Sequence, residues 1–568
     1  MRAHAQRRRD LNLLFVGAIA SALSLLSFQY YFQHNQVLLY GDAVAHINIA
    51  RRLFDSQTPG LLQLGTVWLP LPHLLMAPFL VSDWLWQSGV GGSIPSMIAF
   101  VFGVTGIFRL TRGVLGADER TQPWAGAGAW VAAAIFAANP NLLYLQATAM
   151  TEPLYLALFI WAVVYFWEWT RLVAAEKAGR NGNPLWKCAV CLAGTELTRY
   201  DGWFLAAAAG GLAVVVVKRH WSDRPLRAAV AKFLVAIAIA PLFWLTYNWA
   251  AYGDPLEFAR GPYSARAIEQ KTAQPGYPAH PGAGNLAMAG SFFLKSAELN
   301  MAPGNWGRLW VAVLLAAAFV FLGRLRVAGN VLLLLWTPLL FYALSIARGG
   351  VPLFVPTWWP HTWYNIRYGL QFLPLFALSG VSLAATGPSL VRTTAARFGR
   401  VPAWLEDVSS PRLRGMSAGA ILLLCASSYL SVWRSAPLCF TEAWVNSRTK
   451  LSLEASVARI VSAFPPGTRY LMYAGDHVGA FQQAGVPLRQ MINEGNHRPW
   501  KKPSDPEGLW ERALANPARY ADVVIAFDGD ALDQAVNRGE LTLVTEIHTT
   551  GQPYARIYLT RAAVNQSR

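Results

Sequence analysis

The sequence predicts an α-helical polytopic membrane protein with about eleven transmembrane helices and a small C-terminal α/β soluble domain. Of the 568 residues, 54% are hydrophobic and only 14% are charged, whereas soluble domains carry about a quarter charged residues. The mean hydropathy is +0.29. Apolar runs that are long enough to cross a bilayer alternate with short basic clusters, until a more polar segment begins near residue 434.

The net charge of +17 does not indicate a nucleic-acid partner. The basic residues lie in short clusters between apolar runs, a distribution that is typical of the cytoplasmic loops of membrane proteins. The four cysteines provide no disulfide framework. Cys188 and Cys191 form a CxxC pattern on one face of an apolar helix, which favours a packing role for both.

The first transmembrane helix is expected over residues 11–28. A basic start, "MRAHAQRRRD", precedes the apolar run "LNLLFVGAIASALSLLSF". This run is long enough to span, and no small-x-small cleavage site precedes the aromatic "QYYF". We therefore expect an uncleaved helix whose N-terminus lies inside.

A first outer loop is expected over residues 29–93. It is polar at first and then amphipathic, and Pro59, Pro70, Pro72 and Pro78 interrupt it. Because proline breaks helices, this spacing favours short helices that lie at the membrane interface over one spanning helix.

Ten further spanning helices are expected at 94–110, 125–140, 152–170, 188–198, 202–217, 230–247, 308–322, 330–346, 367–385 and 416–433. With the N-terminus inside, basic residues in inner segments outnumber those in outer segments roughly three to one, as the positive-inside rule requires. The alternative of one long helix over 188–217 would reverse the side of every later loop, so we expect two helices bent at "TRYDGW".

These segments define a transmembrane domain over residues 1–435 and an extracytoplasmic domain over residues 436–568. The second domain contains three strand-like runs rich in β-branched or aromatic residues, at 469–474, 521–527 and 541–547, with helical spacing between them. This alternation predicts a soluble α/β domain.

The start of the first outer loop carries the first candidate functional residues. Asp42 precedes "AVAHINIARRLF", whose apolar residues follow helical spacing, and this places Asp42 at the N-cap position of an amphipathic helix. Its carboxylate either caps the helix or acts as a general base toward a hydroxyl at the membrane surface. His46 lies one turn later on the same face, and His46 and Arg51 are expected to support the loop.

Further polar residues are expected at the same outer surface. Glu152 opens the helix over 152–170, where it either favours the helix dipole or contributes to a site. Arg367 begins a spanning helix, where an arginine is costly without a partner such as a lipid phosphate. Arg260 and Arg266 in the long loop over 248–306, and His361, offer further cations to an anion.

Five segments together resemble a known family. In chain order they are "GDAVAHINIARRLFD", "TVWLPLPHLLMAPF", "MTEPLY", "LTRYDGW" and "YNIRYGLQFLPL". With the topology, which covers roughly residues 1–435, they resemble the GT-C superfamily of membrane glycosyltransferases. The bacterial enzymes related to protein O-mannosyltransferases (family 39) and to the lipid A aminoarabinose transferase are the most similar branches.

The resemblance implies an inverting glycosyltransferase that uses a polyprenyl-phosphate-linked sugar on the outer face of the bacterial cytoplasmic membrane. It implies that Asp42 is the catalytic base, that Glu152 is a second acid, and that Arg367 and the adjacent Tyr368 meet the carrier phosphate. The acceptor would be a hydroxyl of a glycan, lipid or protein. The lipid-linked sugar is the donor substrate, and neither a cofactor nor a metal ion is expected.

Two departures from the family pattern narrow this expectation. Ala43 follows Asp42, so the Asp-Glu pair of the mannosyltransferases is absent, which weakens the case for mannose and for a protein acceptor. The first loop also has no DxD motif, which argues against the metal-dependent oligosaccharyltransferase branch.

Two other functions remain open at this point. A membrane transporter would carry ionisable residues near mid-depth and paired internal halves, whereas the polarity here gathers on one face. A transferase for another lipid-linked group would share the topology.

Overall fold

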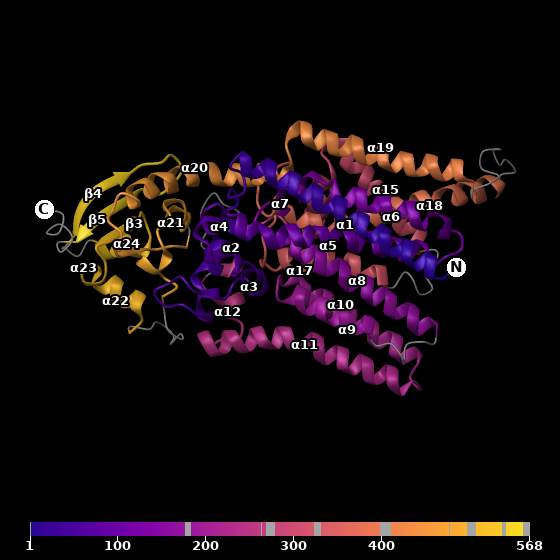
Figure 1. Cartoon of the computed structure of the whole chain (residues 1–568), viewed down its shortest axis with the longest axis horizontal. Coiled ribbons are helices and arrows are strands. Elements are labelled where there is room, and N and C mark those ends of the chain that lie inside the picture. The colour runs from indigo at the N-terminus through magenta and orange to yellow at the C-terminus, as the bar shows by residue number, and fades with distance from the viewer. Residues whose placement is uncertain are drawn as a thin grey trace.

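The computed structural model describes the chain from residue 2 to residue 560, except residues 176–182, 263, 268–278, 323–330, 398–409, 476, 497–506 and 537–540. A bundle of long helices occupies one side of the molecule and a small sheet domain the other, with short helices between them (Figure 1). The N-terminus lies at the end of the bundle that faces away from the sheet.

The long bundle helices are α1 (Arg2–Gln33), α5 (Val90–Leu115), α8 (Glu152–Ala174), α10 (Asp201–Arg219), α11 (Arg224–Tyr252), α18 (Leu373–Arg397) and α19 (Pro411–Ser435). Shorter or bent members are α6 (Ala125–Ala137), α7 (Pro140–Gln146), α9 (Asn183–Glu196), α14 (Leu286–Met301), α15 (Gly304–Leu322) and α17 (Thr337–Ala347). Within the described ranges, seven helices are long and apolar enough to cross a membrane, or up to nine if each of two bent pairs forms one span. The chain is thus a multi-pass membrane protein.

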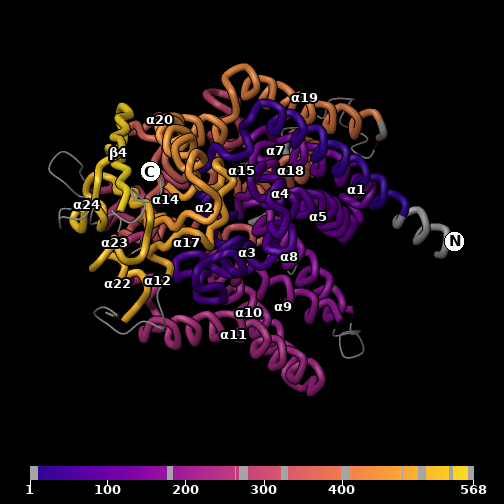
Figure 2. The backbone as a smooth tube through the Cα atoms, turned by 60° about the vertical axis from the view of Figure 1, so that its left-hand side comes forward, coloured from indigo at the N-terminus to yellow at the C-terminus, as the bar shows by residue number. Residues whose placement is uncertain are grey.

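Each of the eleven expected spanning segments overlaps a helix, so the predicted fold class is confirmed. How many of these helices cross the bilayer, and in which direction, stays a prediction. Helix α11 lies at the rim of the bundle (Figure 2). Its exposed side chains include Val235, Ile239 and Phe243, as expected for a surface that faces lipid.

The segment over 188–217 forms two helices, as expected. Helix α9 ends at Glu196 and α10 begins at Asp201, so "LTRY" forms the turn between them. Gly202 makes this turn possible, because a β-carbon there would clash with the backbone of Thr195. The tight turn brings Arg199 and Asp201 to the same end of the bundle.

The loop over 29–93 consists of short helices broken at prolines. They are α2 (Gly41–Arg52), η1 (Leu61–Leu64), α3 (Leu71–Met76), η2 (Phe79–Val81) and α4 (Asp83–Gln87). The long loop over 248–306 contains α12 (Glu257–Arg260) and also α14, a helix that was not predicted. Helix α14 turns by 114° into α15 and packs against α17 and the 3₁₀ helix η6 (Ile366–Phe372).

The C-terminal part is an α/β domain, as predicted. It begins with the long helix α20 (Leu438–Val461) and contains a five-stranded sheet in the order β2-β1-β3-β5-β4. The strands are β1 (Tyr470–Met472), β2 (Met491–Ile492), β3 (Val523–Phe527), β4 (Leu541–Ile547) and β5 (Ala555–Thr560). Strands β2, β1 and β3 run parallel, whereas β5 is antiparallel to both β3 and β4.

The α/β domain packs directly on the loop over 29–93. The buried carboxylate of Asp55 accepts hydrogen bonds from the backbone amide of Leu488 (3.3 Å) and from Arg489 (3.1 Å). Asn48 of α2 donates to Gln482 (2.7 Å), which in turn donates to the carbonyl of Trp86 (2.8 Å). These buried polar contacts fix the position of the loop against the α/β domain.

Candidate functional site

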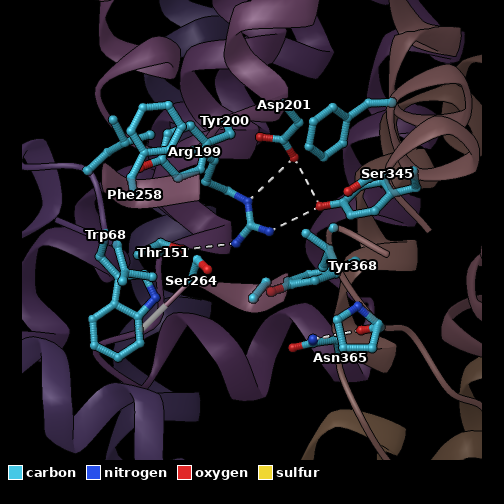
Figure 3. A pocket seen from close by; sticks show the side chains of 18 of the residues that line it. Trp68, Thr151, Arg199, Tyr200, Asp201, Phe258, Ser264, Ser345, Asn365 and Tyr368 are labelled. Atoms are coloured by element: carbon cyan, nitrogen blue, oxygen red, sulfur yellow. Dashed lines mark hydrogen bonds and ion pairs between the residues drawn. The ribbon is translucent and has the colours of Figure 1, made fainter. Parts of the chain in front are cut away.

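A cavity of about 600 Å³ lies where the loop over 29–93 meets the ends of several bundle helices. Its walls come from α2, from the start of α8, from the turn between α9 and α10, and from α17 and η6. In Figure 3, Arg199 reaches into the centre of this cavity, with Trp68 and Phe258 on one side and Tyr368 and Asn365 on the other.

Arg367 binds three carboxylates that come from distant parts of the chain. Its Nη2 donates to Asp42, its Nε donates to Glu152 Oε1 (3.1 Å), and its Nη1 donates to Glu442 Oε1 (3.4 Å). The side chain of Arg367 is only 7% exposed. The expectation that an arginine at this position needs a partner is thus met by protein carboxylates.

Arg199 forms a second cationic centre beside the first. Its Nη1 donates to the same Glu152 oxygen (3.1 Å), its Nε to Asp201 (3.4 Å), and its Nη2 to the hydroxyl of Tyr342 (3.0 Å). Acids and arginines therefore alternate along one chain of contacts, in the order Glu442, Arg367, Glu152, Arg199, Asp201. Such alternation compensates charges that would be costly to bury alone.

Asp42 lines the cavity and is the most exposed acid of this network. Its side chain is 41% exposed, whereas Glu152 and Glu442 are each 1% exposed. The N-cap interpretation of Asp42 is wrong. Tyr40 occupies the N-cap position and no side chain caps α2, while Asp42 lies in the first helical turn. Its carboxylate is bound to Arg367 instead, so it is oriented without being enclosed.

Tyr368 lies between the two arginines. Its ring centre is 4.4 Å from the guanidinium of Arg199 and 5.1 Å from that of Arg367, and it stacks on Tyr342 at 5.2 Å. An aromatic face at this distance stabilises a cation. The predicted residue Tyr368 thus helps to hold both arginines.

His46 lines the cavity and pairs with a second buried histidine. Its Nδ1 lies 2.9 Å from Nε2 of His73, and its ring packs beside Trp68 at 4.5 Å. Burial, together with the nearby charges of Arg367 and Arg199, lowers the pKa of His46 to about 3. His46 therefore stays neutral near pH 7, where it can exchange hydrogen bonds but carries no charge.

Cations that the network does not use also line the cavity. Arg266 was predicted from the sequence, and Arg348 was not. Neither side chain has a hydrogen-bond or ion-pair partner among the described residues, and both are exposed. The cavity thus offers two cations to an anionic ligand.

Three predicted residues lie elsewhere. Arg51 is buried in a structural cluster, where it binds Asp55 (2.8 Å) and Asp83 (2.6 Å). His361 lies in an exposed turn with its Nδ1 3.0 Å from the carbonyl of Pro356, and Arg260 ends the short helix α12. None of the three lines the cavity.

Several site residues were missed at the sequence level. Arg199 and Asp201 lie in "LTRYDGW", a segment that was noted for its resemblance without roles for its charged residues. An arginine and an aspartate beside a helix break were a usable signal. Glu442 carried no such signal, because it lies within a helix after the last predicted span.

The part of the chain that the structure describes contains no group of three or more His, Cys, Asp or Glu side chains that could hold a metal ion. The expectation that the protein uses no metal or cofactor stays a prediction.

The polytopic helical bundle, the short-helix loop, the charged cavity beside that loop and the C-terminal α/β domain together form a fold that is similar to that of solved ArnT structures. The structure of ArnT from Cupriavidus metallidurans bound to undecaprenyl phosphate superposes with a TM-score of 0.56 at 11% identity, covering 96% of this chain and 97% of ArnT. ArnT in the apo state gives 0.55 at 12% identity, covering 97% and 98%.

No protein-family model and no curated protein matches the sequence. At 11–12% identity, the likeness to ArnT concerns the fold.

Proposed function

We propose that the protein is an inverting glycosyltransferase that moves a sugar from a polyprenyl-phosphate-linked donor to an acceptor hydroxyl at the outer membrane surface. The observation that carries this proposal is the Asp42 carboxylate, which is held by Arg367 and faces a cavity lined by Arg266 and Arg348. A base and nearby cations are the groups that this reaction needs, because phosphate is already a competent leaving group.

Asp42 acts as the general base. Its carboxylate takes the proton of the acceptor hydroxyl while the hydroxyl oxygen attacks the anomeric carbon of the sugar. The new glycosidic bond forms as the bond between the anomeric carbon and the phosphate oxygen breaks. Attack from the face opposite the phosphate inverts the configuration, and the carrier leaves as polyprenyl phosphate.

In the proposed reaction, the two exposed arginines that line the cavity bind the phosphate of the donor. Arg266 and Arg348 are available for an anion, whereas Arg367 already binds Asp42, Glu152 and Glu442. Charge grows on the phosphate oxygens as the sugar leaves, and fixed cations stabilise that growth. We therefore assign the phosphate contact to Arg266 and Arg348, and the orientation of Asp42 to Arg367. A phosphate contact by Arg367 was expected from the sequence, and it stays a prediction.

The likeness in fold to ArnT, a structure bound to undecaprenyl phosphate, supports a polyprenyl phosphate carrier. The aromatic residues Trp68, Trp203 and Phe258 line the same cavity and suit the apolar parts of such a donor. The reaction would take place on the outer face of a bacterial cytoplasmic membrane, with a glycan, lipid or protein hydroxyl as acceptor.

A donor panel tests the proposal. Purified full-length protein is incubated with undecaprenyl-phosphate-linked hexoses and pentoses, neutral and amino-substituted, and released undecaprenyl phosphate is measured. Release from at least one donor, absent in the Asp42→Asn variant, is expected. A panel without release by the wild type, in the presence of an envelope extract that supplies acceptors, would refute the proposal.

A further inference from the structure

Glu442 is a buried carboxylate at the site that belongs to the C-terminal part of the chain. It lies in the first turns of α20, after the last bundle helix α19, and is 1% exposed. Its position within a polar tail gave no indication of a role.

Glu442 contacts both segments that carry the Asp42–Arg367 pair. Its Oε1 accepts hydrogen bonds from the backbone amide of Ile366 (3.2 Å) and from Nη1 of Arg367 (3.4 Å). Its Oε2 lies 2.8 Å from the hydroxyl of Tyr40, which precedes α2 and stands two residues before Asp42. One carboxylate thus ties the start of α2 to the start of η6.

The guanidinium of Arg367 has its orientation set by two buried acids. Glu442 binds Nη1 and Glu152 binds Nε, and the ring of Tyr40 lies 5.1 Å from the guanidinium carbon. With these two edges occupied, Nη2 is directed at Asp42, the exposed member of the network. A planar guanidinium held on two edges has little freedom to rotate away.

A buried carboxylate is costly to keep, since an uncharged side chain of similar shape would pack at α20 without desolvating a charge. The three polar groups that converge on Glu442 balance that cost, and two of them flank Asp42 or bind it. The contacts of Glu442 therefore point toward the cavity network and away from the core of the α/β domain.

We infer that Glu442 is a positioning residue for the proposed reaction: it holds Arg367 so that Asp42 keeps a productive orientation, and it makes α20 part of the active site. This inference rests on the proposed function. It implies that the C-terminal part of the chain is required for chemistry.

The test compares Glu442→Gln with Glu454→Gln in the full-length protein, using the undecaprenyl-phosphate donor that the panel identifies. Glu454 is the matched control, because it is a buried glutamate on the same helix that does not line the cavity. For Glu442→Gln we expect kcat to fall about tenfold or more, with the KM for the donor within about twofold of wild type. A kcat equal to that of Glu454→Gln would overturn the inference. If Glu442→Gln does not fold, Tyr40→Phe is measured instead, because it removes one hydrogen-bond partner of Glu442. A fall in kcat with an unchanged KM for the donor is then expected, and an unchanged kcat would overturn the inference.

A second measurement does not depend on turnover, so it separates this inference from the proposed function. Unfolding temperatures are measured for Glu442→Gln, Arg367→Gln and the double variant. If the unfolding temperature of the double variant falls by less than the sum of the two single decreases, the two side chains act together. Additive losses would overturn the inference, even if the donor panel succeeds.

Discussion

Asp42 and Arg367 are 325 residues apart in the chain and form an ion pair at the wall of the cavity. The pair joins the start of α2 to the start of η6. The buried carboxylates of Glu152 and Glu442 bind the other two guanidinium nitrogens of Arg367. A carboxylate held in this way keeps its direction toward the cavity while 41% of it stays exposed. Orientation and accessibility together are what a general base requires.

Replacing Glu152 by Gln is expected to destabilise the protein strongly. Glu152 is 1% exposed and accepts hydrogen bonds from both Arg367 and Arg199, so the neutral variant leaves the charges of the buried Arg367 and the mostly buried Arg199 under-compensated. Breaking a buried pair in this way costs about 3–5 kcal/mol. Thermal unfolding in detergent measures the loss.

Glu168→Gln is the control for this prediction, since Glu168 lies on the same helix and binds Arg109 in a partly exposed pair. Glu168→Gln should lower the free energy of unfolding by about 1 kcal/mol or less. Equal losses in the two variants would contradict the account of the buried network.

Arg266→Gln and Arg348→Gln are expected to raise the KM for the donor more than they lower kcat. Both arginines line the cavity without a partner among the described residues, so their charges are available to the donor phosphate. A rise of about tenfold is expected for each, in line with the loss of one charge-assisted hydrogen bond. Arg260→Gln is the control, because Arg260 does not line the cavity. An unchanged KM in both cavity variants would remove these residues from the phosphate contact.

The protein should lose stability as the pH falls below about 6.5, in part because of His46. Burial lowers its pKa from 6.5 to about 3 in the folded chain. The unfolded chain therefore binds a proton between these two values that the folded chain does not, which favours unfolding as the pH falls through this window. Unfolding temperatures at pH 7.5 and pH 5 should differ less in His46→Gln than in the wild type. His34→Gln, at an exposed histidine, should leave the difference unchanged. An undiminished difference in His46→Gln would contradict this prediction.

Gly202→Ala should disrupt the turn between α9 and α10. A β-carbon at Gly202 meets the backbone of Thr195, which cannot move without separating the two helices. Gly211 lies on the same helix with nothing within 4 Å of a β-carbon, and Gly211→Ala should be neutral or stabilising. Yield of folded protein and unfolding temperature compare the two. Equal behaviour would show that the turn tolerates a side chain.

Much of the fold could be predicted because a bilayer imposes long apolar runs, and each expected run became a helix. Arg367 could be found because an arginine at the start of a spanning helix is costly without a partner. Asp42 and Glu152 could be found because each stands at the start of a helix on the expected outer surface. The break between α9 and α10 was also readable, since "TRYDGW" interrupts an apolar run.

The remaining features depend on contacts between distant segments. The partner of Arg367 on α20, Glu442, lies 75 residues further along the chain. Arg51 was expected to support the loop, but its partners Asp55 and Asp83 could not be named, because only the folded loop brings them together. The spacing predicted Asp42 as an N-cap, but the N-cap is Tyr40, two residues earlier, and the carboxylate of Asp42 binds Arg367. Local pattern does not decide between such competing partners.

The proposed role of Asp42 as the base for sugar transfer is tested by a comparison of the wild type with Asp42→Asn. Single-turnover release of undecaprenyl phosphate is measured for wild type and Asp42→Asn with the donor identified by the panel, after both proteins show the same unfolding temperature. Asp42→Asn is expected to lose activity by about 10²–10⁴-fold, the range that general bases contribute, while still binding the donor. Turnover by Asp42→Asn within a few-fold of wild type would contradict it.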